Sequence, residues 1–98
     1  MIHRIVKMEF DPSKVEEFLS NFEENKSKIR SFAGCYKLKL LQDKHNTNIF
    51  FTYRYWVDEE SLENYRNSEL FKGVWAKTKV LFNAKPVAWS TTVVKSEE

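Results

Sequence analysis

The chain has 98 residues, a net charge of +2 and a single cysteine. A chain of this length forms one domain with a modest core. The near balance of basic and acidic residues provides no basic surface for nucleic acid or an anionic membrane. One cysteine excludes an internal disulfide and a thiolate metal cluster. We therefore expect one domain over residues 1–98, located in the reducing cytoplasm and without a membrane-spanning segment.

The N-terminal residues predict a strand followed by a helix. Polar and apolar residues alternate over residues 1–10, which is typical of a strand, with Arg4 and Val6 on the same face. Asp11 and Pro12 then form the N-cap and the first residue of a helix, because the N–H that proline lacks is not needed there. The apolar positions of this helix lie opposite a face rich in Glu, Lys and Asn, and they are Val15, Phe18, Leu19, Phe22 and Ile29.

Two strands joined by a polar turn are predicted after Gly34, which ends the helical pattern. The first strand covers residues 35–42, the turn covers 43–48, and the next strand covers 49–57. The alternation on the first of these strands places Tyr36, Leu38 and Leu40 on one side and Lys37 and Lys39 on the other.

Two helical segments and a last strand complete the predicted order. Asp58 and Ser68 are the expected N-caps of the two helices. Residues 84–94 predict an edge strand, because Pro86 cannot donate a ladder hydrogen bond. The order β-α-β-β-α-β predicts an α+β fold, a ferredoxin-like sandwich with helices on one face of an antiparallel sheet. The apolar stripe of the second helical segment consists of Leu70, Phe71, Val74, Trp75, Thr78 and Leu81.

The strand at residues 49–57 carries aromatic rings on both faces. One face holds Phe51, Tyr53 and Tyr55, and the other holds Phe50 and Trp56. Helices cover only one face of the predicted sheet, and an uncovered apolar patch of this size is typical of a partner surface. We therefore expect a homodimer that forms through the open sheet face.

An aromatic strand ends at Trp56, an acidic cap follows it, and the segment after the cap carries Tyr65, Ser68, Phe71 and Trp75. This pattern resembles the antibiotic biosynthesis monooxygenase superfamily. The resemblance implies a dimeric α+β barrel with a cavity between sheet and helices in each protomer. It also implies that Trp56 lines this cavity. Thr52 occupies the position of an asparagine that cofactor-free members use, and Leu62 occupies that of a helix tyrosine.

Candidate site residues follow from the resemblance and from the chemistry of the side chains. The candidate catalytic residues are Trp56, Thr52 and Tyr65, and the candidate substrate-binding residues are Arg54, Phe71, Trp75, Val6 and Phe22. Both tryptophans are also consistent with an ordinary core role. Arg54 on a face that leads into the core has two interpretations. The structural one is an ion pair with an acidic neighbour such as Glu9 or Glu69, or a charged end that extends to solvent. The functional one is an anchor for an anionic or enolate-like ligand.

We expect no metal and no cofactor. His3 reads as a structural histidine and His45 as a solvated turn residue, and they form no cluster of metal ligands with Cys35. Cys35 itself reads as a small buried hydrophobe. In the haem-degrading branch of the superfamily, the histidine that binds iron corresponds to Trp75, and an indole N–H has no lone pair for a metal. A buried general base is not evident in the sequence.

Three classes of function remain open. The first is a cofactor-independent monooxygenase that acts on a small aromatic or quinol-like compound in an apolar pocket. The second is a dimeric module that binds such a ligand without chemistry. The third is RNA binding, because RNA-recognition motifs share this element order. The low net charge and the lack of a basic-Gly-aromatic lead on the third strand argue against RNA.

Overall fold

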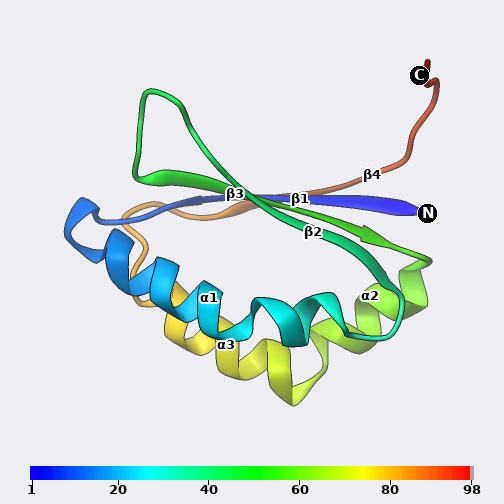
Figure 1. Ribbon diagram of the computed structural model, residues 1–98, viewed down its shortest axis with the longest axis horizontal. Helices are drawn as coiled ribbons and strands as arrows, with labels where there is room; N and C mark the ends of the chain where they lie inside the picture. The colour runs from blue at the N-terminus through cyan, green and yellow to red at the C-terminus, as the bar shows by residue number, and fades with distance from the viewer. Residues whose placement is uncertain (98) are drawn as a thin grey trace.

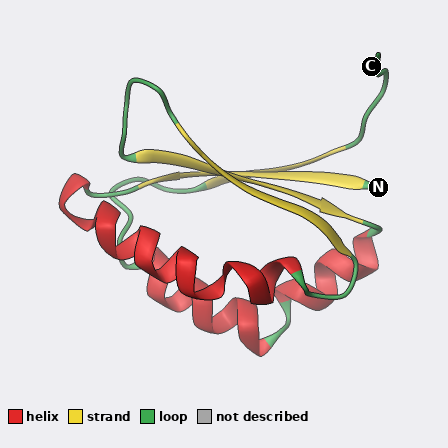
Figure 2. Ribbon diagram, viewed as in Figure 1, coloured by secondary structure: helices red, strands yellow, loops and turns green. Residues whose placement is uncertain are grey.

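The computed structural model describes residues 1–97 and confirms the predicted α+β, ferredoxin-like fold. A four-stranded antiparallel sheet has the order β2-β3-β1-β4, and the helices lie together against one of its faces (Figures 1 and 2). None of these helices is long and apolar enough to cross a bilayer within the described chain. The elements are β1 (Ile2–Glu9), the 3-10 turn η1 (Pro12–Lys14), α1 (Val15–Arg30), β2 (Cys35–Gln42), β3 (Ile49–Trp56), α2 (Glu59–Arg66), α3 (Glu69–Lys79) and β4 (Val87–Thr91).

Side-chain caps define where the helical segments begin. The carboxylate of Asp11 accepts a hydrogen bond from the backbone N–H of Ser13 at 2.9 Å, and η1 then leads directly into α1. Asp58 accepts from the N–H of Ser61 at 2.8 Å at the start of α2. The hydroxyl of Ser68 accepts from the N–H of Phe71 at 3.1 Å at the start of α3. The three predicted caps are confirmed, and each satisfies a donor that the helix itself leaves unpaired.

The start of β2 departs from the predicted alternation. Cys35 lies opposite Trp56 and Lys37 lies opposite Tyr55, so Tyr36 is one residue too many on this strand. The extra residue forms a β-bulge, which leaves Cys35 buried and Tyr36 55% exposed. The rest of the predicted alternation agrees with the register, because Leu38 and Leu40 lie opposite Arg54 and Thr52 and Lys37 and Lys39 lie opposite Tyr55 and Tyr53.

Two other local predictions also need correction. The asparagines of the first helix were expected on its polar face, but Asn21 is buried and donates through Nδ2 to Thr78 Oγ1 at 3.2 Å. This bond ties α1 to α3 and compensates for burying the amide. The last strand is β4, Val87–Thr91, which is shorter than the predicted span 84–94. It lies at the sheet edge as predicted, and its pairing with β1 begins directly after Pro86.

The core under the sheet consists of two clusters. The first contains Val6, Met8, Phe10, Phe18, Phe50 and Leu81. The second contains Ile29, Cys35, Trp56, Leu62 and Tyr65. Both clusters use the even-numbered face of β1 and β3, which is the face that the helices cover.

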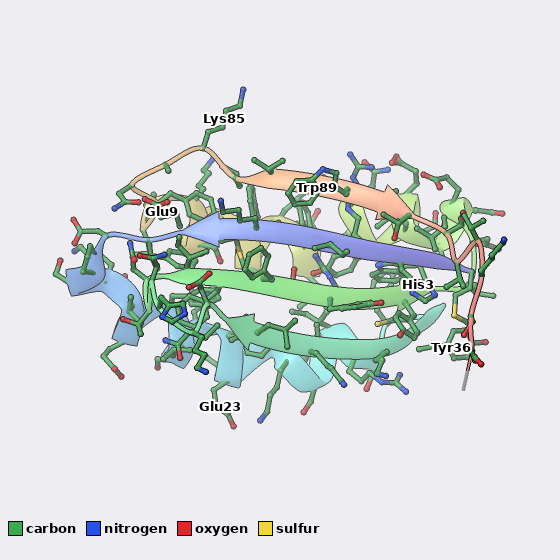
Figure 3. All side chains as sticks on the ribbon, turned by 90° about the horizontal axis from the view of Figure 1, so that it is seen from above. His3, Glu9, Glu23, Tyr36, Lys85 and Trp89 are labelled. Carbon is green, nitrogen blue, oxygen red and sulfur yellow. The ribbon has the colours of Figure 1, made fainter. Side chains whose placement is uncertain are left out.

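The other face of the sheet has no helix above it, and Figure 3 views the molecule from this side. The strand register places His3 opposite Tyr55 and Ile5 opposite Tyr53, and Trp89 of β4 adjoins Ile5. The imidazole of His3 stacks on Tyr55 with ring centroids 3.9 Å apart. The open face is therefore lined by rings across three strands, and Trp89 is 45% exposed there.

Candidate active site

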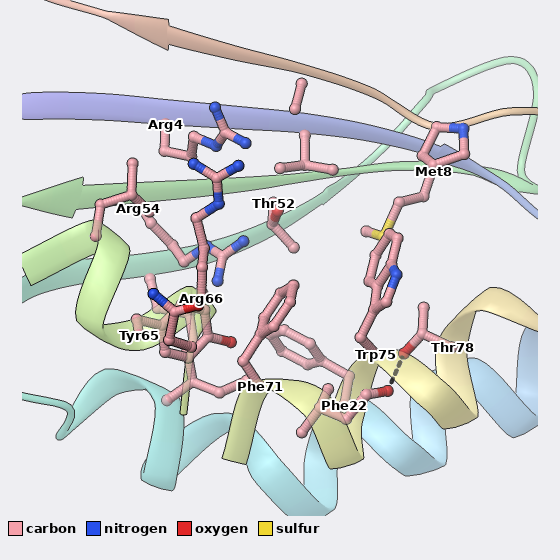
Figure 4. Close-up of a pocket in the computed structure, with 18 of the residues that line it drawn as sticks. Arg4, Met8, Phe22, Thr52, Arg54, Tyr65, Arg66, Phe71, Trp75 and Thr78 are labelled. Carbon is pink, nitrogen blue, oxygen red and sulfur yellow. Dashed lines mark hydrogen bonds between the residues drawn. The ribbon is translucent and has the colours of Figure 1, made fainter. Parts of the chain in front are cut away.

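A cavity of about 500 Å³ lies between the helix-covered face of the sheet and the three helices. This volume is in the range of pockets that hold small organic ligands. Side chains from β1, β3, α2 and α3 form most of its wall (Figure 4). The cavity is lined by Arg4, Val6, Met8, Phe18, Phe22, Ile29, Leu38, Thr52, Arg54, Leu62, Glu63, Tyr65, Arg66, Asn67, Phe71, Val74, Trp75, Thr78, Pro86 and Ala88.

Aromatic and sulfur-containing side chains form one part of the cavity. Phe71 and Trp75, one turn apart on α3, stack with ring centroids 5.9 Å apart and an interplanar angle of 12°. Phe22 of α1 and Met8 of β1 complete this wall, with Trp75 and Met8 at the end away from the arginines (Figure 4). Flat, polarizable surfaces of this kind favour a planar aromatic ligand.

Three arginines form the opposite end of the cavity (Figure 4). Arg4 and Arg54 are direct partners on β1 and β3, and Arg66 comes from the last turn of α2. The guanidinium carbon of Arg54 lies 5.2 Å from the ring centroid of Tyr65, at cation–π distance. The cavity therefore combines an apolar end with a strongly positive end.

Burial and charge alter the ionisation of two groups at the positive end. Burial lowers the pKa of Arg4, and the charges of Arg66 and Arg54 lower it further, although Glu59 and Glu63 partly oppose them. Burial also raises the pKa of the Tyr65 phenol, with Arg54 acting in the opposite direction. Tyr65 is thus a protonated hydrogen-bond donor at neutral pH.

Most of the predicted site residues share this cavity. The predicted residues that line it are Thr52, Tyr65, Arg54, Phe71, Trp75, Val6 and Phe22. Thr52 is buried, and its hydroxyl has no hydrogen-bond partner among residues 1–97. A ligand group at this point would therefore find a free donor and acceptor.

Trp56 is the exception among the predicted residues. It is 0% exposed and does not line the cavity, because Tyr65 and Phe32 pack against it with ring centroids 5.0 and 6.3 Å away. Its indole N–H has no partner within residues 1–97. The structure thus places Trp56 behind the cavity wall, where its ring supports Tyr65.

The ion pair that was one interpretation of Arg54 is not present among residues 1–97. Within residues 1–97, the ion pairs found are Lys26–Glu23 and Arg66–Glu63, so Arg54 is paired with neither Glu9 nor Glu69. Its Nε atom is buried and has no hydrogen-bond partner in this part of the chain. The interpretation with an acidic partner is wrong because neither glutamate comes within ion-pair distance of this guanidinium.

Sequence reasoning missed Arg4 and Arg66 as cavity residues. Arg4 shares a strand face with Val6, so the alternation already directed it toward the helices. Arg66 gave no such signal, because a basic residue in the last turn of a helix is common for electrostatic reasons. Only the packing of α2 against the sheet brings it to the cavity.

The remaining candidates lie outside the cavity. His3 accepts or donates a hydrogen bond with the Tyr53 hydroxyl at 3.2 Å on the open face, and His45 is exposed in the turn after β2. Cys35 is buried, and burial raises the pKa of its thiol. Among residues 1–97, no three His, Cys, Asp or Glu side chains come together as metal ligands would.

Comparison with known protein families shows which family this chain belongs to. The profile of the antibiotic biosynthesis monooxygenase family matches residues 1–77, which contain β1 to β3, α1, α2 and most of α3. The chain belongs to the antibiotic biosynthesis monooxygenase family. The predicted resemblance is confirmed. No curated protein matches the chain at a significant level.

Solved structures share the fold over nearly the whole chain. A structure named antibiotic biosynthesis monooxygenase has a TM-score of 0.91 and 18% identity, over 97% of this chain and 100% of its own. A conserved protein from Methanosarcina mazei has a TM-score of 0.88 and 22% identity, over 92% and 89%. A Pseudomonas aeruginosa protein has a TM-score of 0.85 and 21% identity, over 96% and 94%. At these identities the likeness establishes the fold alone.

Proposed function

We propose that this protein is a cofactor-independent monooxygenase that oxidises a small aromatic, quinol-like compound in the cavity. The observation that carries the proposal is the composition of the wall. Stacked rings of Phe71 and Trp75 hold a planar compound, while Thr52, Arg54 and Tyr65 present hydrogen-bond donors beside it. Donors placed where negative charge develops are the main requirement for stabilising an oxyanion in a dry site.

The proposed reaction needs dioxygen as the only co-reactant. A ring CH₂ that is conjugated through an aromatic ring to a carbonyl, as in an anthrone, loses a proton, and the resulting enolate transfers one electron to O₂. The two radicals combine to form a C–O bond, and a proton completes the hydroperoxide. Loss of water then leaves a ketone, so one oxygen atom stays in the product and the other leaves as water with two hydrogens. The side chains bind the enolate and exclude solvent from it.

The carboxylate content of the cavity bears on a second candidate function. Glu63 is the one carboxylate among the described lining residues, and its 2.9 Å ion pair with Arg66 occupies it. The substrate in our proposal therefore loses its proton to solvent before it enters the cavity, and the positive end draws in the resulting anion. A module that binds the same aromatic compound without chemistry would need no base, so this observation favours it as the alternative.

Oxygen uptake with an anthrone as the probe separates the two functions. We expect uptake above the spontaneous rate, with one ketone formed per O₂ consumed. Arg54→Gln should lower kcat by about 10²- to 10³-fold, because it removes a donor to the oxyanion. Lys44→Gln, which removes a charge from the exposed turn after β2, is the matched control. Anthrone binding without uptake above the spontaneous rate would assign the protein to the binding module.

The partner proposed for this protein is a second copy of itself. The support is the open face of the sheet, where the register brings the side chains of His3, Ile5, Tyr53, Tyr55 and Trp89 together on neighbouring strands. A two-fold dimer would bury this surface with no other gene product, and family members are commonly dimeric. We also propose a cytoplasmic location, which an unpaired buried cysteine supports.

A further inference from the structure

Arg4 and Arg54 form an unusual pair in the sheet. They are direct partners on neighbouring antiparallel strands, and both line the cavity (Figure 4). Like charges at directly opposed positions destabilise a sheet. Burial and the charges of Arg66 and Arg54 add to this cost, since all three lower the pKa of Arg4. A bound anion would reverse these unfavourable terms.

The chain itself provides little compensation for these two charges. Arg4 donates through Nη1 to the hydroxyl of Ser90 at 2.9 Å, which is a neutral acceptor. Arg54 contacts the ring face of Tyr65, and its Nε has no partner within residues 1–97. The third arginine differs from both, because Arg66 is ion-paired with Glu63 at 2.9 Å. Two guanidinium groups at one end of an apolar cavity are therefore available to a ligand.

We infer that Arg4 and Arg54 bind the carboxylate of an aromatic acid whose ring lies against Phe71 and Trp75. This inference rests on the proposed use of the cavity and specifies its substrate class. When the carboxylate of such an acid occupies Arg54, Thr52 and Tyr65 remain as donors to the oxyanion, whereas an anthrone has no carboxylate and leaves Arg54 free for that role. Guanidinium forks match a planar carboxylate through paired N–H donors, which is a stronger and more directional contact than a point charge provides. The apolar wall and the positive end share one cavity, so one molecule with a ring and a carboxylate fits both.

A matched pair of probes tests the inference independently of oxygen chemistry. Binding of 2-naphthoate and of its neutral analogue 2-naphthamide is measured by tryptophan fluorescence and calorimetry at neutral pH. We expect 2-naphthoate to bind about 10-fold or more tightly than the amide. Arg4→Gln and Arg54→Gln should each weaken 2-naphthoate binding by about 10- to 100-fold and change amide binding by less than about 3-fold. Circular dichroism and thermal unfolding verify that each variant is folded.

Two controls sharpen the result. Arg54→Lys keeps the charge but loses the fork, so its affinity for 2-naphthoate should fall between those of the unmutated protein and Arg54→Gln. Lys44→Gln makes the same change in net charge on the turn that rises away from the helices (Figure 1), and it should leave both affinities unchanged. Equal loss of affinity in Lys44→Gln would overturn the inference in favour of long-range attraction.

The remaining outcomes distinguish the inference from the proposed function. Equal affinity for the acid and the amide would overturn the carboxylate subsite and leave the aromatic cavity in place. Tighter binding of 2-naphthyl phosphate than of 2-naphthoate would overturn the carboxylate assignment in favour of a phosphate group. Binding of none of the three probes would overturn both the inference and the proposed use of the cavity.

Discussion

Arg54 and Trp56 lie two residues apart on the same face of β3, but their surroundings differ completely. Arg54 borders the cavity, whereas Trp56 is fully buried behind Tyr65. Tyr65 contacts both, through the guanidinium at 5.2 Å and the indole at 5.0 Å. The phenol ring of Tyr65 therefore separates Trp56 from the ligand space that Arg54 borders.

The raised pKa of Tyr65 predicts a specific dependence of stability on pH. In the unfolded chain a tyrosine ionises near pH 10, whereas in the folded protein burial keeps Tyr65 protonated to higher pH. The unfolded state then binds fewer protons, so the free energy of unfolding falls as pH rises from about 10 through the folded pKa. Below about pH 10 this contribution is fully present.

Tyr65→Phe removes this titration and should flatten the fall in stability at high pH. The measurement is the free energy of unfolding in urea from about pH 8 to about pH 11. Tyr36→Phe removes a phenol from an exposed position and serves as the control. If Tyr65→Phe loses stability as steeply as the unmutated protein over this range, Tyr65 is not protected by burial.

At the scale of elements, the two glycines of this chain have opposite structural roles. Gly34 joins α1 to β2 with φ of +89°, a conformation that other residues rarely adopt, and an added Cβ would overlap Ser61 of α2. Gly73 lies inside α3, where an added Cβ would meet no atom within 4 Å. The first glycine therefore allows α2 to approach the chain, and the second only weakens its helix.

Alanine at the two positions should change stability in opposite directions. Gly34→Ala is expected to destabilise the protein by about 1–3 kcal/mol from backbone strain, with the overlap at Ser61 adding to this cost. Gly73→Ala should stabilise it by about 0.5–1 kcal/mol, because alanine favours a helix interior. Urea unfolding of both variants provides the measurement. Equal effects at the two sites would contradict the special role of Gly34.

The whole molecule is a sheet with helices on one face (Figure 2), and the other face carries aromatic rings. The positions on β3 that face away from the helices carry Phe51, Tyr53 and Tyr55, and Trp89 of β4 extends this surface to the edge strand. Aromatic pairs across strands stabilise the sheet locally, but the extent of this surface exceeds that need. The proposed dimer accounts for it.

A charge at the centre of this surface should separate the subunits. Tyr53→Lys would place an ammonium group among the rings of two copies, where it has no partner and loses its hydration. We expect sedimentation equilibrium to show a dimer for the unmutated protein and a monomer for Tyr53→Lys at micromolar concentration. Val80→Lys adds the same charge to an exposed position after α3 and should remain dimeric. A monomer for the unmutated protein would contradict the proposed interface.

Local sequence patterns determined the elements of this protein. Alternation and helical spacing predicted every strand and helix in order, and Asp11, Asp58 and Ser68 were recognisable as caps. These features depend on neighbouring residues, because backbone geometry and caps act over a few positions. The residues that face the cavity from β3 and α3 followed from the same periodicity.

Only the tertiary structure decided which of these residues form the site. No short segment of the sequence carries a signature of three features. They are the bulge at Tyr36, the position of Trp56 behind Tyr65, and the presence of Arg4 and Arg66 in one cavity. Each depends on strand register and on how α2 packs against the sheet, which are set by contacts between residues distant in sequence. A local pattern specifies the face on which a side chain lies, whereas its neighbours on that face are set by the packed chain.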